Sequence, residues 1–489
     1  MSWTDIQTHL DTFFTALGDI VWGWPMLILL VGSGVFLTVV LGGIQFRTLG
    51  YALKLAFGKE ARSKNPNAGQ GDITNFEALM TALAATAGVG NIVGVATAVA
   101  LGGPGAVFWM WMSGLFGMAT KYTECLLGVY YRRRNAYGEM SGGPMYYIRD
   151  GLADIRWMKA LRLNVLLGGA FAVMMALGAT VMGGMVQSNA VSDTMHSTFG
   201  VPLMGTAVVI TALAALVMLG GVQRLGTVSS ALVPTMVVIY ALAGTAILLL
   251  NAPELPALFA SIFTDAFSGT AAVGGFAGAA LKEAIRYGLA RGTFANESGM
   301  GSAPIAAAAA RTKHPVEQGL ISMTQTFLDT FLICTFSALV VLVADVWLTG
   351  KTGGALTAES FGQGLPWQIA NVSIGAIVVT VSLTLFAYTT IIGWSFYGEK
   401  GLAYLGGDKL VKPYRVFYLM LVFIGANMSL PLAWKIVENF TGLMIVPNLI
   451  ACVLLFPLVK RLTADYFANL KNGKLIDKPR WTVKPFAHD

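Results

Sequence analysis

The sequence has few charged residues for its length. Only 12% of its 489 residues are Asp, Glu, Lys or Arg, whereas soluble domains carry roughly 25%. A water-soluble fold of this size needs a polar surface, and long stretches of this chain cannot supply one. Because 55% of the residues are hydrophobic, the composition predicts a protein that has lipid as its solvent.

Cysteine and histidine are also scarce. The three cysteines lie in apolar segments, and their odd number argues against a disulfide framework or a metal cluster. The four histidines stand far apart and fit no spacing of metal ligands. A phosphate-binding loop is missing as well, because Asp345 stands where the glycine preceding Gly350-Lys351-Thr352 would be. We therefore expect no enzyme, no cofactor and no transition metal.

The N-terminus lacks the basic segment of a cleaved signal peptide. Residues Met1–Trp24 contain three aspartates but neither lysine nor arginine. The mature protein is therefore expected to begin at or near Met1.

Long apolar segments are abundant. A hydrocarbon core of about 30 Å needs roughly 20 apolar residues per helix. Eleven segments meet or approach this length, and the seventh is the weakest because its second half carries Lys282, Glu283 and Arg286. The eleven predicted spans are Met26–Leu41, Ala78–Leu101, Ala106–Tyr130, Leu163–Ser188, Leu203–Gly220, Ser230–Leu250, Gly269–Ala290, Leu320–Trp347, Val372–Phe396, Val416–Leu432 and Thr441–Val459.

The basic residues are distributed unevenly between the two sides that these spans define. Lys and Arg are enriched in cytoplasmic loops of membrane proteins, so the side with more of them is predicted to be cytoplasmic. That side receives nearly all 32 basic residues, including Arg291 after the seventh span and seven residues from Lys460 onward; only Lys351 and Lys435 fall opposite. We predict an integral protein of the cytoplasmic (inner) membrane, with its N-terminus outside and its C-terminus inside. The formal net charge of +7 then reflects topology, with anionic lipid rather than nucleic acid as the partner.

Two spans are interrupted by glycine. Span two contains Gly88, Gly90 and Gly94 near its middle, and span seven opens with the glycine-dense stretch Gly269–Gly278. Five crossings separate them, so they run in opposite directions. This predicts an all-α fold of two inverted five-helix repeats, residues 71–250 and 251–460, with residues 1–70 adding a first helix and a basic loop and 461–489 a cytoplasmic tail.

Paired broken helices are typical of a transporter's binding site. Free N–H groups at an unwound helix attract a carboxylate, and freed carbonyls can ligate a cation. The alternative is that the glycines only allow close packing of helices. A channel built from the same helices also remains open, and it differs from a carrier in being unable to concentrate its substrate.

Three motifs resemble those of the alanine or glycine:cation symporter family. They are Ala85–Ala98 followed by Leu101-Gly102-Gly103-Pro104-Gly105, the segment Ser141–Tyr147, and Arg291–Pro304. The resemblance implies a LeuT-like fold of five plus five inverted helices. It also implies symport of a small neutral amino acid with sodium by alternating access; coupling to a proton is the alternative.

The resemblance further implies a substrate site at the two glycine-rich stretches. Backbone N–H groups of Gly88, Val89 and Gly90 would bind the carboxylate, with Asn91 beside them. Carbonyls of the second stretch would bind the ammonium group, and an aromatic ring would form an apolar wall. The residues expected there are Thr270, Gly274, Gly275 and Phe276.

A cation site is expected where two hydroxyls lie at membrane depth in span nine. Sodium prefers oxygen ligands, which Thr389 and Thr390 can supply together with backbone carbonyls. The carbonyls considered are those of Ala84, Ala87 and Phe386. Membrane threonines often bond their own helix instead, which is the alternative reading.

Three further polar or aromatic residues have open roles. Asp329, roughly ten residues into span eight, could ligate sodium, carry a proton or brace helices. Trp394 could limit substrate size or anchor the chain at the interface. Gln187 could face the substrate or be solvated. Lys121 and Glu124, one turn apart in span three, are predicted to form a local ion pair near the cytoplasmic end. The sequence does not reveal alanine against glycine, D against L preference, stoichiometry or oligomeric state.

Overall fold

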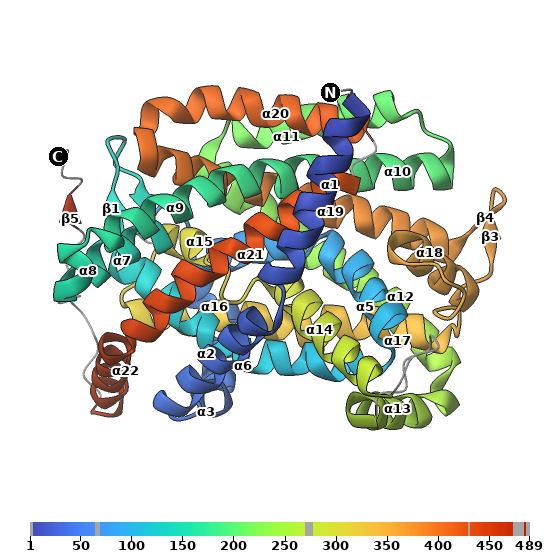
Figure 1. Cartoon of the computed structure of the whole chain (residues 1–489), viewed down its shortest axis with the longest axis horizontal. Coiled ribbons are helices and arrows are strands. Elements are labelled where there is room, and N and C mark those ends of the chain that lie inside the picture. The colour runs from blue at the N-terminus through green and yellow to red at the C-terminus, as the bar shows by residue number, and fades with distance from the viewer. Residues whose placement is uncertain (1–2, 64–68, 269–276, 429–430, 473–483, 486–489) are drawn as a thin grey trace.

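Helices make up nearly all of the structure, a computed structural model that describes residues 3–63, 69–268, 277–428, 431–472 and 484–485 (Figure 1). The helices of the first part are α1 (Trp3–Val21), α2 (Trp24–Val40), α3 (Ile44–Phe57), α4 (Asn75–Thr86), α5 (Val95–Gly102), α6 (Gly105–Tyr130), α7 (Pro144–Gly151), α8 (Arg156–Ala160), α9 (Leu163–Gly178), α10 (Gln187–Phe199), α11 (Leu203–Met218) and α12 (Gly221–Leu250). The remaining helices are α13 (Leu255–Ser268), α14 (Ala277–Asn296), α15 (Ala303–Ala309), α16 (Pro315–Thr326), α17 (Thr335–Val343), α18 (Gly353–Gly364), α19 (Ile374–Gly406), α20 (Val411–Ala426), α21 (Pro431–Leu454) and α22 (Phe456–Lys471).

Among the described residues, strands are confined to two-residue pieces. β1 (Arg133–Arg134) pairs antiparallel with β2 (Met140–Ser141) and parallel with β5 (Lys484–Pro485), and Arg133 faces Ser141 in the register. β3 (Gln368–Ile369) and β4 (Val372–Ser373) form a hairpin with Ile369 opposite Val372. These pieces pin loops at the two ends of the helical body (Figure 1).

A described helix covers most of each of the eleven predicted spans. By length and hydropathy, five uninterrupted helices of the described chain can cross a membrane, or seven if two bent pairs each count as one span. The others fall short for physical reasons: α11 and α20 have 16 residues each, and α6 and α14 carry charged side chains. The count of eleven therefore stays a prediction.

Small residues allow helices to approach closely. Gly288 of α14 faces Ala106 of α6, and a Cβ atom at Gly288 would lie 2.4 Å from the Ala106 carbonyl oxygen. A side chain at this position would therefore force α6 and α14 apart.

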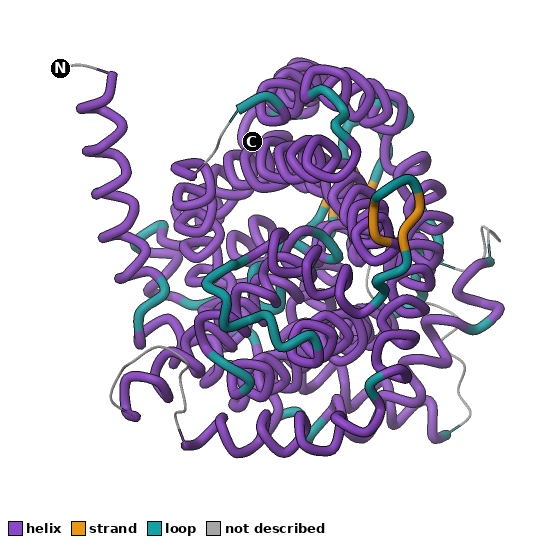
Figure 2. The backbone as a smooth tube through the Cα atoms, turned by 90° about the vertical axis from the view of Figure 1, so that its right-hand side faces the viewer, coloured by secondary structure: helices purple, strands orange, loops and turns teal. Residues whose placement is uncertain are grey.

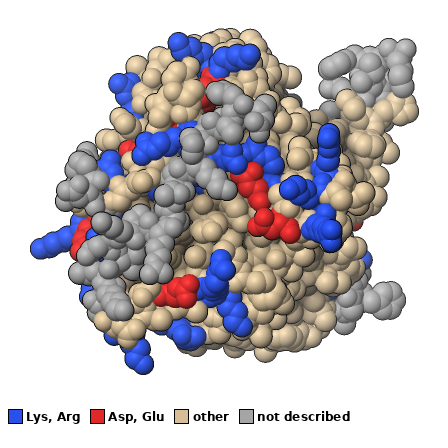
Figure 3. All heavy atoms as spheres, turned by 90° about the vertical axis from the view of Figure 1, so that its left-hand side faces the viewer, with Lys and Arg blue, Asp and Glu red and all other residues tan. Residues whose placement is uncertain are grey.

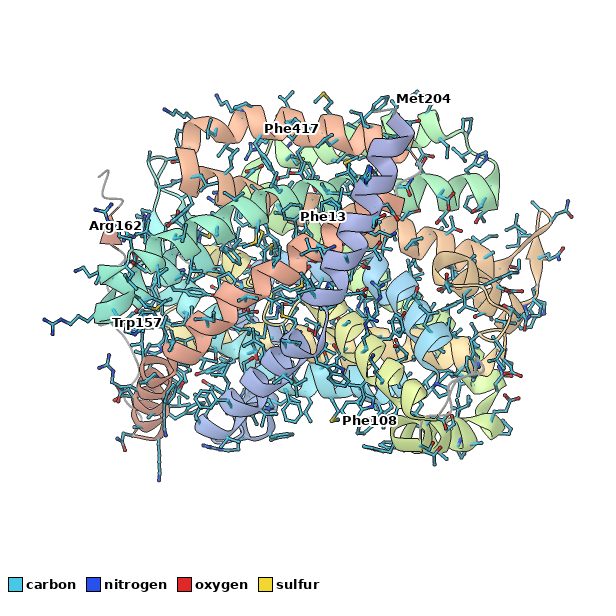
Figure 4. The ribbon with its side chains drawn as sticks, viewed as in Figure 1. Phe13, Phe108, Trp157, Arg162, Met204 and Phe417 are labelled. Carbon is cyan, nitrogen blue, oxygen red and sulfur yellow. The ribbon has the colours of Figure 1, made fainter. Side chains whose placement is uncertain are left out.

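The outside of the helical body is apolar. Large hydrophobic side chains such as Ile20, Leu219 and Val416 are 70–72% exposed, and Figure 4 shows Phe417 of α20 and Met204 of α11 at its edge. Basic side chains instead gather at the end that carries α7, α8 and α22 (Figure 3), near Arg162. An apolar belt and a basic end are what a bilayer-embedded chain requires.

Candidate substrate and cation site

The first interruption lies between α4 and α5, as the glycines of span two predict. α4 ends at Thr86, and a π-helical segment, Gly90–Gly94, leads into α5 with a bend of 53°. Gly88 sits between them, where a Cβ atom would lie only 2.5 Å from Thr390 Oγ1 and 3.2 Å from Gln187 Oε1. Glycine is therefore required by the close approach of two other helices.

The free amides of this interruption point at side-chain oxygens. The Gly88 N–H donates to Asn91 Oδ1 at 3.2 Å, and the Val89 N–H donates to Gln187 Oε1 at 3.3 Å. Gln187 is 2% exposed. The alternative in which its side chain is solvated is therefore excluded. Two amide donors of the interruption thus face neutral acceptors that a carboxylate can replace.

Asn91 links the interruption to Asp329. Its Nδ2 donates to Asp329 Oδ1 at 2.7 Å and to Cys334 Sγ at 3.3 Å, while its carbonyl oxygen accepts from Ser337 Oγ at 2.7 Å. Asp329 lies in the π-helical segment Phe327–Cys334 between α16 and α17 and is fully buried. This arrangement fits the bracing role among the three considered for Asp329.

The expected cation ligands come together around Thr390 on α19. Its Oγ1 lies 3.1 Å from the Ala84 carbonyl oxygen, 3.4 Å from that of Ala87 and 3.0 Å from that of Phe386. One hydroxyl proton can serve only one of these acceptors at a time. The Thr389 hydroxyl also lies 2.9 Å from the Phe386 carbonyl oxygen, and its other neighbour is Met236 Sδ at 3.6 Å. Apart from the Met236 sulfur, the neighbours named for these two hydroxyls are oxygens, which suits a hard cation.

A second interruption separates α14 from α15. Residues 297–302 carry three positive φ angles, 54° at Glu297, 87° at Gly299 and 78° at Gly301. This break was not predicted from the sequence, although the motif Arg291–Pro304 contains it and its two glycines are the signal. The stretch expected to be unwound, with Thr270, Gly274, Gly275 and Phe276, lies outside the described residues.

Glu297 places a buried carboxylate at this second interruption. Trp394 Nε1 donates to Glu297 Oε1 at 3.0 Å, and Ser302 Oγ donates to Oε2. Trp394 Nε1 also lies 3.2 Å from the Ala85 carbonyl oxygen, so this indole connects both interruptions. Trp394 is 0% exposed, which excludes the interfacial anchor.

A buried ion pair on α6 contacts the unwound residues 297–302. Lys121 Nζ lies 3.4 Å from Glu124 Oε1, which confirms the predicted pair, and it donates to the Glu297 carbonyl oxygen at 3.0 Å. Asn448 Nδ2 donates to both Glu124 Oε2 and the Gly299 carbonyl oxygen, each at 2.8 Å. Both charged side chains are 0% exposed, so the pair braces the unwound backbone instead of a solvated helix end.

The structure does not group Arg291 with the basic loops, as the predicted topology did. Arg291 Nη1 lies 2.7 Å from Glu438 Oε1 near the start of α21, beside Trp22, whose Nε1 donates to the Glu438 carbonyl oxygen. The predicted topology places both Glu438 and Trp22 at the end opposite the basic loops. The cause is that α14 continues past the predicted end of span seven to Asn296, so Arg291 lies within the helix and not in a loop.

Comparisons with known proteins identify transporters as relatives. The chain is 47% identical to the sodium/alanine symporter AgcS of Methanococcus maripaludis, over 93% of this chain and 97% of that protein. It is 48% identical to an uncharacterized transporter of Haemophilus influenzae, over 94% and 97% of the two chains. Among solved structures, a mutant of the manganese transporter of Eremococcus coleocola matches with a TM-score of 0.43 and 13% identity, covering 82% of this chain and 73% of that one.

The apolar helices and the two interruptions that meet in the interior define an integral membrane protein of a transporter class. The model of the Sodium:alanine symporter family matches residues 7–479. The chain belongs to this family, whose transported substrates are an amino acid and sodium.

Proposed function

We propose that this chain imports a small neutral amino acid, alanine first, together with sodium by alternating access. The family and the 47% identical relative named a sodium/alanine symporter support the substrate class. We also propose the LeuT-like fold of two inverted five-helix repeats, with the second interruption at residues 297–302. In such folds the substrate binds where two discontinuous helices meet.

The substrate carboxylate is assigned to the amides of the first interruption. Gly88 and Val89 now donate to the side-chain oxygens of Asn91 and Gln187. A carboxylate is the stronger acceptor, because hydrogen bonds to a charged group are roughly twice as strong as neutral ones. Binding then requires the side-chain oxygens of Asn91 and Gln187 to give up these two hydrogen bonds.

The substrate ammonium group is assigned to Glu297 in the second interruption. Its buried carboxylate already accepts two hydrogen bonds, from Trp394 and Ser302, and has lone pairs left for a charged donor. Glu297 takes the role that the resemblance gave to Thr270, Gly274 and Gly275.

Small substrates are favoured because large residues close around the two interruptions. Trp394 packs against Gly183 so tightly that a Cβ atom there would lie 2.2 Å from Trp394 Cβ. From the other side, the Phe294 ring lies 3.2 Å from where a Cβ atom of Gly90 would be. A methyl side chain suits such a site better than a long one.

One peptide group carries the proposed coupling. The Ala87 carbonyl oxygen faces the cation cluster at 3.4 Å from Thr390 Oγ1, while the Gly88 N–H faces the carboxylate side at 3.2 Å from Asn91 Oδ1. These atoms belong to the same trans peptide and point in opposite directions. A cation at the carbonyl polarises the N–H toward the carboxylate, so each ligand strengthens binding of the other.

Uptake into proteoliposomes tests the proposal. Separate sodium and proton gradients are imposed with a panel of amino acids. We expect a sodium gradient alone to accumulate alanine above its outside concentration. Accumulation with a proton gradient alone would favour proton coupling, for which Asp329 beside Asn91 is the candidate. Equilibration without accumulation under either gradient would indicate a channel.

A further inference from the structure

A cleft of about 230 Å³ lies between α1, α14 and α21. We call it the N-terminal cleft, because α1, which stands out from the helical body in Figure 2, forms one wall. The cleft is large enough to hold several water molecules. Its charged lining residues are Asp19, Arg286, Arg291, Lys435 and Glu438.

The charges of this cleft form ion pairs that water can reach. Arg291 and Glu438, 2.7 Å apart, have side chains 21% and 30% exposed. Arg286 and Asp19, 3.1 Å apart, are 34% and 68% exposed. Exposed pairs are weak because water and mobile ions compete for both partners. A carboxylate from outside the chain can therefore exchange with Glu438 on Arg291.

The N-terminal cleft and the proposed substrate site share one wall residue, Phe294. Phe294 lines the cleft, and its ring lies 3.2 Å from the position of a Cβ atom at Gly90. Arg291 precedes Phe294 by one helical turn, with its guanidinium carbon 6.0 Å from the ring centroid. Both belong to the motif Arg291–Pro304. Exchange of the carboxylate that pairs with Arg291 would therefore take place next to the Phe294 ring, which borders the proposed substrate site.

We propose that the N-terminal cleft is a second binding site for a small zwitterionic amino acid. The substrate carboxylate takes the place of Glu438 on Arg291, and the substrate ammonium group pairs with the released Glu438. Both signs of charge are needed, since a plain anion would leave the Glu438 carboxylate without its partner. The inference rests on the proposed function, because the cleft holds the amino acid before it passes Phe294. In the predicted orientation it opens to the outside.

Trp22 provides a reporter for the test. It lines the cleft, and its Nε1 donates to the Glu438 carbonyl oxygen at 3.0 Å. The full-length protein in sodium-free buffer is titrated with L-alanine. The emission due to Trp22 is obtained by subtracting the emission of the Trp22→Phe variant. The Gly90→Leu variant, whose side chain obstructs the proposed substrate site at the two interruptions, is titrated in the same way. L-alaninamide, which lacks the carboxylate, is the control ligand.

We expect a saturable change in Trp22 emission with alanine in both proteins, and at least tenfold weaker binding of alaninamide. Arg291→Gln should weaken the response at least tenfold, whereas Arg224→Gln, at an arginine that does not line the cleft, should keep it. An unchanged response in Arg291→Gln, an equal response to alaninamide, or no response from Trp22 would overturn the proposal. Failure of the proposed function is seen separately, as absence of sodium-driven uptake by the wild type.

Discussion

Replacing Thr390 by valine removes a hydroxyl that faces three backbone carbonyls while keeping the shape of the side chain. Thr390 Oγ1 lies 3.0–3.4 Å from the carbonyl oxygens of Phe386, Ala84 and Ala87. Two oxygens that ligate one cation at about 2.4 Å and at right angles lie roughly 3.4 Å apart. These separations are therefore compatible with shared ligation of sodium.

The size of the effect follows from the loss of one oxygen ligand. A hydrogen bond or polar contact to a charged group contributes about 1.5–3 kcal/mol, and each 1.4 kcal/mol is tenfold in affinity. Thr390→Val should therefore raise the sodium concentration for half-maximal uptake by about 10- to 100-fold. Thr390→Ser, which restores the hydroxyl, should return it to within about threefold of wild type.

The assay is initial alanine uptake into proteoliposomes at varied external sodium. Thr384→Val is a matched control, because the Thr384 hydroxyl bonds the Thr380 carbonyl of its own helix at 2.7 Å. We expect this control to respond to sodium like wild type. If Thr390→Val has an unchanged sodium response, or if Thr384→Val shows the same shift, the assigned cation site is wrong.

Three further predictions concern other parts of the chain. Gly88→Ala should lower uptake at least tenfold because its Cβ atom would lie 2.5 Å from Thr390 Oγ1. The control Gly169→Ala has open space around it and should transport normally. Normal uptake by Gly88→Ala would count against the assigned role of the first interruption. Glu297→Gln should raise the KM for alanine about tenfold or more by removing the charge opposite the ammonium group, and an unchanged KM would reject that role. Burial lowers the pKa of His314, at the N-terminal end of α16, from 6.5 to about 4. Its neutral form therefore stabilises the fold above pH 6.5, and this contribution is lost as the pH falls toward 4. Between pH 7.5 and 5 the loss is about 2 kcal/mol, so the wild-type melting temperature should drop more than that of His314→Gln, and parallel curves would contradict this.

The sequence predicted much of the first interruption correctly. Glycines in an apolar run mark a break in a membrane helix, and two adjacent hydroxyls in another span mark polar atoms at the same depth. The glycine signal is local, so composition and spacing suffice to find the break, whereas the cation ligands were expected from the resemblance to the symporter family. The contact between Thr390 and the Ala84 and Ala87 carbonyls agrees with that reading.

The second interruption could not be predicted from the spacing of residues alone. The glycine-dense stretch Gly269–Gly278, most of which lies outside the described residues, stays a prediction. The break at residues 297–302 contains only two glycines and a polar run that looks like a loop. Glu297 meets Trp394 and Lys121 across 97 and 176 residues of sequence. Such pairs arise from the way α6, α14 and α19 pack, which no single segment encodes.

Equilibrium binding of alanine with and without sodium is the decisive measurement of whether one peptide group joins the two ligands. Radiolabelled alanine is titrated against the purified protein in saturating sodium and in choline. We expect alanine to bind at least tenfold more tightly in sodium, and saturating alanine to raise sodium affinity by the same factor. Equal alanine affinity in sodium and choline would contradict it.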